Sequence, residues 1–192
     1  MKNQIVRSTA LVCLLVVAVT AVSAQQEPSY KELPNFHKVG EGFYRGAQPL
    51  DGGLKRLSEL GIKTVINLRG TDELTGTQQK EAESAGLRYF NVPMPGLSAP
   101  SDEQVAQVMA IVNDPQNQPV FIHCKRGADR TGTISAIYRI SHDDWTADRA
   151  IAEARRYGMS WAEFGMRSYI SNYHKQLART RTRNQPAAVA NQ

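Results

Sequence analysis

Cysteine is scarce in this sequence: only Cys13 and Cys124 occur among 192 residues. Two cysteines exclude a disulfide-rich scaffold. Because Cys13 lies in an N-terminal segment that we expect to be removed, the mature chain would contain a single thiol and no internal disulfide. Cys124 is then either a buried, inert residue or a reactive residue retained for its chemistry, and its neighbours must distinguish the two.

The sequence also has no long hydrophobic run. The longest apolar stretch covers about 13 residues, from Ala10 to Val22, whereas a membrane-spanning helix needs roughly 20. Lys2 and Arg7 precede this stretch and Val22-Ser23-Ala24 ends it, which is typical of a cleavable secretory signal. We therefore expect residues 1–24 to be a signal peptide cut after Ala24, and the mature protein to be exported to the bacterial periplasm without stable membrane insertion. An uncleaved anchor helix is the weaker alternative.

Excess charge of one sign is small. The chain has 23 Lys and Arg against 18 Asp and Glu, a net charge of +5, and without Lys2 and Arg7 the remainder carries 21 against 18, or +3. Arg179, Arg181 and Arg183 account for much of that remainder, so the folded body is nearly neutral and no nucleic-acid-binding patch is expected. A hydrophobic content of 41% suits one soluble globular domain, which we expect to be a monomer.

Short β-rich runs alternate with helical periods between residues 36 and 178. This order predicts an α/β fold, a three-layer sandwich with a central, mostly parallel sheet flanked by helices. Strands are expected at 36–39, 43–45, 62–68, 87–92 and 120–123, and helices at 50–60, 77–85, 101–113, 131–142, 146–157 and 161–178. Residues 25–35 are predicted to be a lead-in segment, and residues 179–192 a disordered basic tail. Trp145 and Trp161 are expected to pack between helices.

The candidate functional segment runs from His123 to Gly132, directly after the last predicted strand. Cys124 and Arg130 are separated by five residues between a buried strand and a helix start, a spacing in which backbone N–H groups can surround a tetrahedral anion. The same groups favour the Cys124 thiolate, which is the nucleophilic form, and Arg130 can bind two phosphate oxygens at once. The Thr131 hydroxyl is expected to hydrogen-bond the sulfur, and His123 to support the loop. The expected phosphate-binding residues are Lys125, Arg126, Gly127, Ala128, Asp129 and Arg130.

The run His-Cys-x-x-Gly-x-x-Arg-Thr-Gly resembles the motif of the cysteine-dependent phosphatases, the protein-tyrosine and dual-specificity superfamily. The segments Phe-Tyr-Arg-Gly-Ala-Gln-Pro at 43–49 and Val-Ile-Asn-Leu-Arg at 65–69 are similar to those of bacterial and fungal dual-specificity-like members. The resemblance implies a protein-tyrosine-phosphatase-like fold and a phosphomonoester hydrolase without metal or other cofactor. It further implies a phosphocysteine on Cys124 and phosphate binding by Arg130. Substrates would be phosphorylated proteins, phosphoinositides or inositol phosphates.

The general acid is the point at which this sequence departs from that pattern. Relatives usually supply an aspartate from a loop before the cysteine, but the corresponding residues 93–100 contain no carboxylate. Asp102 and Asp129 are the candidates, with a slight preference for Asp129. Asp102 could instead complement a helix dipole, and Asp129 could instead stiffen the loop.

Three further alternatives remain open at this level. Lys125 and Arg126 either extend a positive rim or are a solvated pair, and Arg69 either braces the loop or touches substrate. The chain could bind phosphate with little turnover, as a pseudophosphatase. It could also be a rhodanese-like sulfurtransferase, although Arg130 and Thr131 speak against that.

Overall fold

A five-stranded sheet forms the centre of the fold in the computed structural model, which describes residues 29–70 and 73–184. The strands are β1 (His37–Gly40), β2 (Phe43–Ala47), β3 (Thr64–Asn67), β4 (Arg88–Asn91) and β5 (Val120–Cys124). Their order across the sheet is β1-β2-β5-β3-β4, with β1 antiparallel to β2 and every other pair parallel. The predicted signal peptide at 1–24 lies outside the described residues, as do the first four residues of the predicted lead-in segment.

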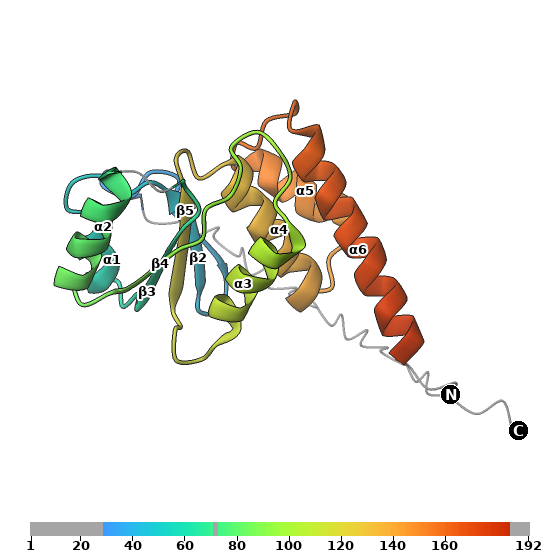
Figure 1. Cartoon of the computed structure of the whole chain (residues 1–192), viewed down its shortest axis with the longest axis horizontal. Coiled ribbons are helices and arrows are strands. Elements are labelled where there is room, and N and C mark those ends of the chain that lie inside the picture. Colours follow the sequence, from blue (N-terminus) through green and yellow to red (C-terminus); the bar gives the residue numbers. More distant parts are fainter. Residues whose placement is uncertain (1–28, 71–72, 185–192) are drawn as a thin grey trace, which may run out of the picture.

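Helices cover both faces of this sheet, as Figure 1 shows. Helices α1 (Gly53–Glu59) and α2 (Glu73–Ser84) lie on one face. The other face carries α3 (Asp102–Asn113), α4 (Asp129–His142), α5 (Ala147–Arg156) and α6 (Phe164–Asn184). The prediction of a three-layer α/β sandwich with a mostly parallel central sheet is therefore confirmed.

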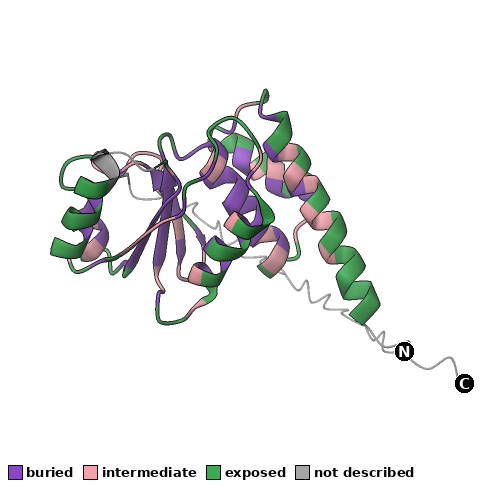
Figure 2. Cartoon of the chain, in the orientation of Figure 1, coloured by how far each residue is buried: buried purple, intermediate pink, exposed green. Residues whose placement is uncertain are grey.

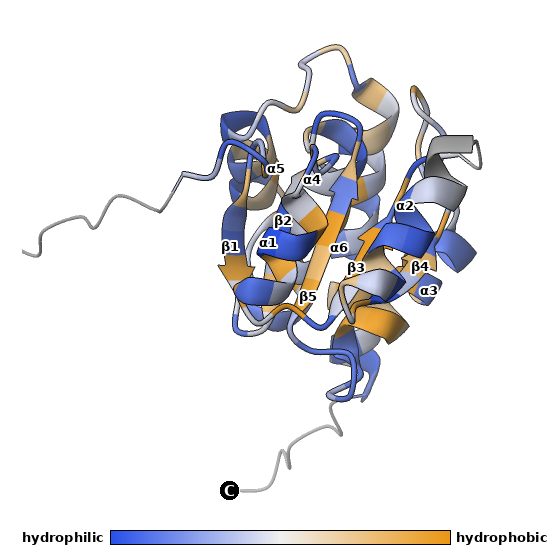
Figure 3. Ribbon diagram, turned by 90° about the vertical axis from the view of Figure 1, so that its left-hand side faces the viewer, coloured by the Kyte–Doolittle hydropathy of each residue, from blue (hydrophilic) through white to orange (hydrophobic). Residues whose placement is uncertain are grey.

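Burial of the strands explains why the sheet is central. All residues of β3 and β5 are buried, and Figure 3 shows their hydrophobic residues behind α1 and α2. One apolar cluster, which includes Leu57 and Val65, fills the space under α1 and α2. A second, which includes Ile122 and Ile134, fills the space under α3 and α4. Apolar surface removed from water on both faces is what keeps parallel strands in the middle of a fold.

The register of the parallel strands brings the carboxyl ends of β2, β3, β4 and β5 to the same side of the sheet, with Asn91 of β4 opposite Asn67 of β3. Cys124, the last residue of β5, lies opposite Ala47 of β2, and His123 lies between Gly46 of β2 and Asn67 of β3. In open α/β sheets, ligand sites form at the carboxyl ends of parallel strands. The segments that follow β2, β3, β4 and β5 therefore meet at one edge of the sheet.

The C-terminal boundary differs from the prediction. Residues 179–184 were expected to belong to a disordered tail, but α6 continues through Asn184. The last turns of α6 are exposed and extend away from the body of the molecule (Figure 2). Their sequence has no apolar face, so a pattern search for buried helices could not detect them. The remaining part of the predicted tail, residues 185–192, lies outside the described residues.

Within the described residues, no helix has both the length and the apolar character required to cross a bilayer.

Candidate active site

The site is built on the loop that joins β5 to α4. The strand ends at Cys124, residues 125–128 turn, and α4 begins at Asp129, so the loop lies at a helix N-terminus that favours anions. Gly127 has a φ of 67°, and a Cβ at this position would lie 2.5 Å from the backbone nitrogen of Ala47. Only glycine satisfies both the left-handed conformation and this close approach to β2.

Two side chains without a role assigned from the sequence hydrogen-bond the backbone carbonyl groups of the loop. Asn35 donates its amide hydrogens to the carbonyl oxygens of Arg126 (3.2 Å), Gly127 (3.1 Å) and Tyr157 (3.1 Å). Arg45 is completely buried in β2, and its Nη2 donates to the Gly127 carbonyl at 2.5 Å. These contacts fix the carbonyl side of the loop. A charged residue inside an otherwise buried strand was the sequence signal that could have revealed Arg45.

The Cys124 thiol is buried, and its pKa is nevertheless lowered. Burial alone would raise the pKa, but it is outweighed by hydrogen bonding to the Thr131 hydroxyl and to the backbone N–H groups of Thr131 and Ala128, and by the charge of Arg130. The Thr131 hydroxyl is itself buried and makes no hydrogen bond of regular geometry in the described part of the chain, so it acts on the sulfur by proximity. The arrangement therefore shifts the thiol toward the thiolate, in the direction that the sequence predicts, and ionisation at neutral pH stays a prediction.

His123 is fully buried beside the cysteine. Burial, the dominant cause, lowers its pKa to about 3, and the positive charges of Arg69 and Arg130 act in the same direction. Its Nδ1 lies 3.4 Å from the Cys124 carbonyl oxygen, and its Nε2 has no hydrogen-bond partner among the described residues. A neutral imidazole in this position supports the strand end, and at neutral pH it lacks the second ring proton that a general acid would donate.

Arg130 extends across the strand ends next to β5. Its Nη1 donates to the carbonyl oxygens of Leu68 (3.2 Å) and Met94 (3.5 Å), which follow β3 and β4 respectively. The guanidinium is half-buried and its charge contributes to the lowered pKa of Cys124. It is thus positioned in advance as a cation at the mouth of the loop.

Asp129 has both carboxylate oxygens occupied. Its Oδ2 accepts a hydrogen bond from Arg126 at 2.6 Å, and its Oδ1 accepts one from the backbone N–H of Ser160 at 2.9 Å. Lys125 and Arg126 are both exposed, and Arg126 is tied back to the loop by its ion pair with Asp129. These contacts are those expected of a residue that braces the loop.

Asp102 lies at the first turn of α3, is exposed, and accepts a hydrogen bond from the Tyr169 hydroxyl at 2.6 Å. Burial and this contact with Asp102 raise the pKa of Tyr169.

Arg69 donates from Nη1 to the Gln48 side chain at 3.0 Å, which links the end of β3 to the segment after β2. That contact supports the first of the two roles left open for Arg69, bracing the site, and does not test contact with substrate.

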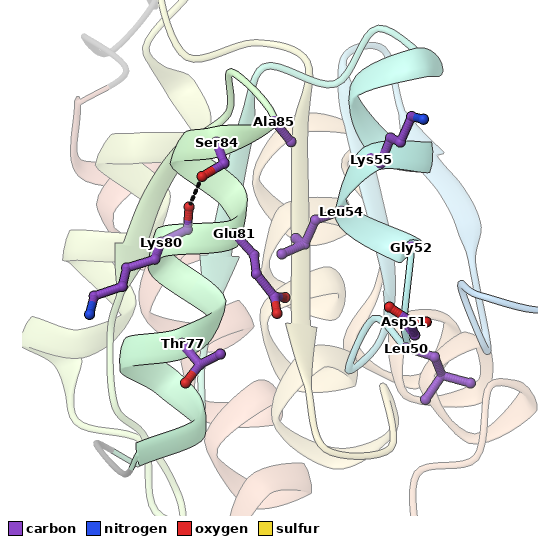
Figure 4. A pocket seen from close by; sticks show the side chains of 10 residues that line it. All are labelled: Leu50, Asp51, Gly52, Leu54, Lys55, Thr77, Lys80, Glu81, Ser84 and Ala85. Carbon is purple, nitrogen blue, oxygen red and sulfur yellow. Dashed lines mark hydrogen bonds between the residues drawn. The ribbon is translucent and has the colours of Figure 1, made fainter.

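A separate hollow of about 680 Å³ lies between α1 and α2 (Figure 4). Its lining includes two lysines, Lys55 and Lys80, and two acids, Asp51 and Glu81, but none of the residues from 123 to 132. Balanced charges and the absence of a nucleophilic thiol from its lining make it a poor alternative to the β5–α4 loop. Within residues 29–70 and 73–184, no group of three or more His, Cys, Asp or Glu side chains could hold a metal ion.

The fold and this loop define a class: an α/β domain that presents a low-pKa thiol and an arginine around an anion cradle. Residues 17–172 match the family described as DSP-PTPase phosphatase fused to NAD+ kinase. The chain belongs to this family, within the cysteine-dependent dual-specificity and tyrosine phosphatase superfamily.

Individual relatives match parts of the chain. It is 27% identical over 124 residues to the dual specificity protein phosphatase TpbA of Pseudomonas aeruginosa, covering 65% of this chain and 55% of TpbA. It is 35% identical over 96 residues to the chloroplastic NAD kinase 2 of Arabidopsis thaliana, covering 48% of this chain and 10% of the kinase. The core catalytic domain of the PP-IP phosphatase SIW14 from S. cerevisiae superposes with a TM-score of 0.67 at 26% identity, covering 79% of this chain and 93% of that one.

Proposed function

We propose that this chain is a phosphomonoester hydrolase that acts through a phosphocysteine on Cys124. The observation that carries the proposal is the lowered pKa of a buried thiol at the base of an anion-binding loop, beside Arg130. A thiolate held opposite a guanidinium and a helix N-terminus suits in-line attack on a phosphoryl group. Membership in the phosphatase family supports the same conclusion.

In the first step the Cys124 sulfur attacks phosphorus, the bond to the leaving oxygen breaks, and that oxygen takes a proton from a carboxylic acid. In the second step water attacks the phosphocysteine and gives a proton to the carboxylate that the first step produced; the phosphorus–sulfur bond breaks, the Cys124 thiolate is restored and inorganic phosphate leaves. Arg130 and the loop N–H groups bind the equatorial oxygens throughout. The Thr131 hydroxyl stabilises the sulfur as it is released in the second step.

The proton donor is proposed to be Asp102 instead of Asp129, which reverses the slight preference from the sequence. Both oxygens of Asp129 already accept hydrogen bonds, so protonation would break one of them. Only one oxygen of Asp102 accepts a hydrogen bond within the described residues. We expect Asp102→Asn to slow an alkyl phosphate, which has a poor leaving group, far more than an activated aryl phosphate, and Asp129→Asn to slow both alike. Equal effects of Asp102→Asn on the two substrates would exclude Asp102 as the acid.

The decisive experiment measures phosphate release from para-nitrophenyl phosphate by the purified protein. We expect vanadate to inhibit turnover and Cys124→Ser to abolish it. Phosphate binding without turnover would favour the pseudophosphatase, and sulfur transfer from thiosulfate to cyanide would favour the sulfurtransferase. Relatives named as dual specificity phosphatases and as inositol diphosphatases support testing phosphopeptides and inositol phosphates in parallel.

Export is part of the proposal. The cationic, apolar and small-residue zones of residues 1–24 support cleavage after Ala24 and delivery to the periplasm. N-terminal sequencing of protein recovered from a bacterial periplasmic fraction should give Gln25 as the first residue. An intact Met1 would contradict this proposal without affecting the proposed chemistry.

A further inference from the structure

Three large apolar side chains are left in water next to the candidate active site. Leu97 is 88% exposed, Trp161 is 68% exposed and Phe164 is 63% exposed. Trp161 was expected from the sequence to pack between helices, and that expectation is wrong; Trp145, by contrast, lies under the guanidinium groups of Arg139 and Arg149. Single exposed apolar residues are common on protein surfaces, but a cluster of them is typical of a binding surface.

We propose that Leu97, Trp161 and Phe164, here called the apolar rim, form a subsite for an apolar side chain that flanks the phosphorylated residue of a peptide. The inference rests on the proposed phosphatase function and adds the chemistry of its substrate. It assigns specificity to a surface that takes no part in the phosphoryl-transfer steps.

The apolar rim is attached to the phosphate loop from two sides. The backbone N–H of Ser160, next to Trp161, donates to the Asp129 carboxylate at 2.9 Å. The segment that carries Leu97 is attached through Met94, whose carbonyl accepts a hydrogen bond from Arg130 at 3.5 Å. Both rim segments are therefore in contact with the first residues of α4, immediately after the loop that begins at Cys124.

The two rim segments also touch each other. A Cβ placed on Gly165 would lie 3.4 Å from the backbone nitrogen of Ala99, so the start of α6 packs directly against the Pro-rich segment. In Figure 1 this segment, which connects β4 to α3, passes beside the start of α6. The apolar side chains are thus presented from neighbouring segments and do not belong to separate faces of the molecule.

The two aromatic side chains of the apolar rim contact each other and a neighbouring arginine. Trp161 and Phe164 meet edge to face, with ring centroids 6.3 Å apart and planes at 85°. The guanidinium of Arg167 lies 4.8 Å from the centroid of the Phe164 ring. Aromatic anchors that are already held in place lose little conformational entropy on binding, which is why they dominate recognition surfaces.

The chemistry of the apolar rim favours a peptide over an inositol polyphosphate. An inositol polyphosphate presents only charged and hydroxyl groups, so it would gain nothing from exposed aromatic and leucine side chains. A peptide places an apolar residue within a few ångströms of its phosphorylated side chain, where it can cover these groups. Arg126, at the loop, is already paired with Asp129, and Arg167 lies on the Phe164 ring.

The test compares two phosphotyrosine peptides that are identical except that leucine and phenylalanine flank the phosphotyrosine in one and glycine in the other. Because the reacting group is the same, the ratio of their kcat/KM values isolates the flanking contacts. We expect the wild type to prefer the apolar peptide by about tenfold or more, the range associated with apolar pockets. Trp161→Ala combined with Phe164→Ala should bring the ratio close to one.

Leu60→Ala is the matched control, because Leu60 is an exposed leucine after α1, before the amino end of β3. It should keep the wild-type ratio, and thermal unfolding midpoints should confirm that all variants are folded. A wild-type ratio of one, or a preference that survives loss of both aromatic residues, overturns the subsite. So does dissociation of a dimer by Trp161→Ala with the peptide preference unchanged, since the apolar rim would then serve self-association.

Failure of the subsite and failure of the phosphatase function give different results. If neither peptide is hydrolysed, the proposed function fails for phosphopeptides. The affinities of both peptides for the Cys124→Ser variant, measured by calorimetry, then still report the subsite. Equal affinities would reject the subsite, and tighter binding of the apolar peptide that is lost with the two aromatic residues would support it.

Discussion

Replacing Arg45 with methionine is expected to lower catalysis while leaving the free energy of unfolding nearly unchanged. Arg45 is completely buried, its guanidinium lies 4.7 Å from the centroid of the Tyr157 ring, and burial lowers its pKa to about 10. Its Nε and Nη1 have no hydrogen-bond partner within the described residues, so only Nη2 is satisfied, by the Gly127 carbonyl. A buried cation with one hydrogen bond is costly to maintain, which indicates a role other than stability.

The magnitudes follow from that geometry. Removing a hydrogen bond to a charged group costs about 1.5–3 kcal/mol, but removing the incompletely paired buried charge offsets most of this, and methionine fills a similar volume. We therefore expect unfolding to change by no more than about 1 kcal/mol. The phosphate loop, in contrast, loses one of the two side-chain contacts that fix the Gly127 carbonyl, and only the Asn35 amide remains. If the transition state loses the full energy of that hydrogen bond, about 1.5–3 kcal/mol, kcat/KM falls by roughly 10- to 100-fold, because about 1.4 kcal/mol corresponds to a factor of ten.

Two measurements check this prediction together. Urea unfolding gives the stability, and kcat/KM for para-nitrophenyl phosphate across pH gives both the rate and the pKa of Cys124. Since the charges of Arg45 and Cys124 favour each other, the thiol pKa should rise in the variant. Arg56→Met, which removes an exposed arginine paired with Glu32 and Glu59, is the control and should change neither quantity by much. A variant of Arg45 that is strongly destabilised but retains full kcat/KM would refute the reasoning.

Three further predictions concern the loop itself. Gly127→Ala should abolish turnover and phosphate binding, because a Cβ would lie 2.5 Å from the Ala47 nitrogen; normal kcat/KM would disprove the close approach. Thr131→Ala should move the acid limb of the kcat/KM profile to higher pH, since the hydroxyl lowers the pKa of Cys124, and an unmoved limb would count against that contact. His123→Asn should weaken the loss of stability between pH 6.5 and 3, where the unfolded histidine takes up a proton and the folded one, with a pKa of about 3, does not. The wild type should lose up to about 1.4 kcal/mol more per pH unit than the variant in urea unfolding, and parallel curves would contradict this.

The sheet could be predicted because its signals are local. The runs at 62–68 and 120–123 are apolar and β-branched, as buried parallel strands require, and Gly61 and Gly86 mark the ends of helical periods. Ser101 and Gln104 form a capping box at the start of α3, and their three-residue spacing is visible in the sequence. The placement of Cys124 next to Arg130 and Thr131 also followed from the strand-loop-helix pattern alone.

The supports of the loop could not be predicted in the same way, because they arrive from distant parts of the sequence. Asn35 precedes the Gly127 carbonyl that it binds by 92 positions, and it lies in a polar segment that reads as a linker. The slight preference for Asp129 as the acid could not take into account its second contact, the Ser160 N–H, which is 31 residues away along the chain. Spacing along the chain identifies the group that reacts, but which groups hold it depends on the packing of separate elements.

Trp161 is a residue whose burial could not be predicted from the sequence pattern. Apolar residues at three- and four-residue spacing predicted a helix from residue 161 with Trp161 in its packed face, yet the helix begins at Phe164 and both rings are exposed. Periodicity indicates that a residue belongs to an apolar stripe, not that a partner covers that stripe. When an expected core residue is found in water beside a candidate active site, the missing partner is to be sought among substrates, and the paired peptides measure whether it is one.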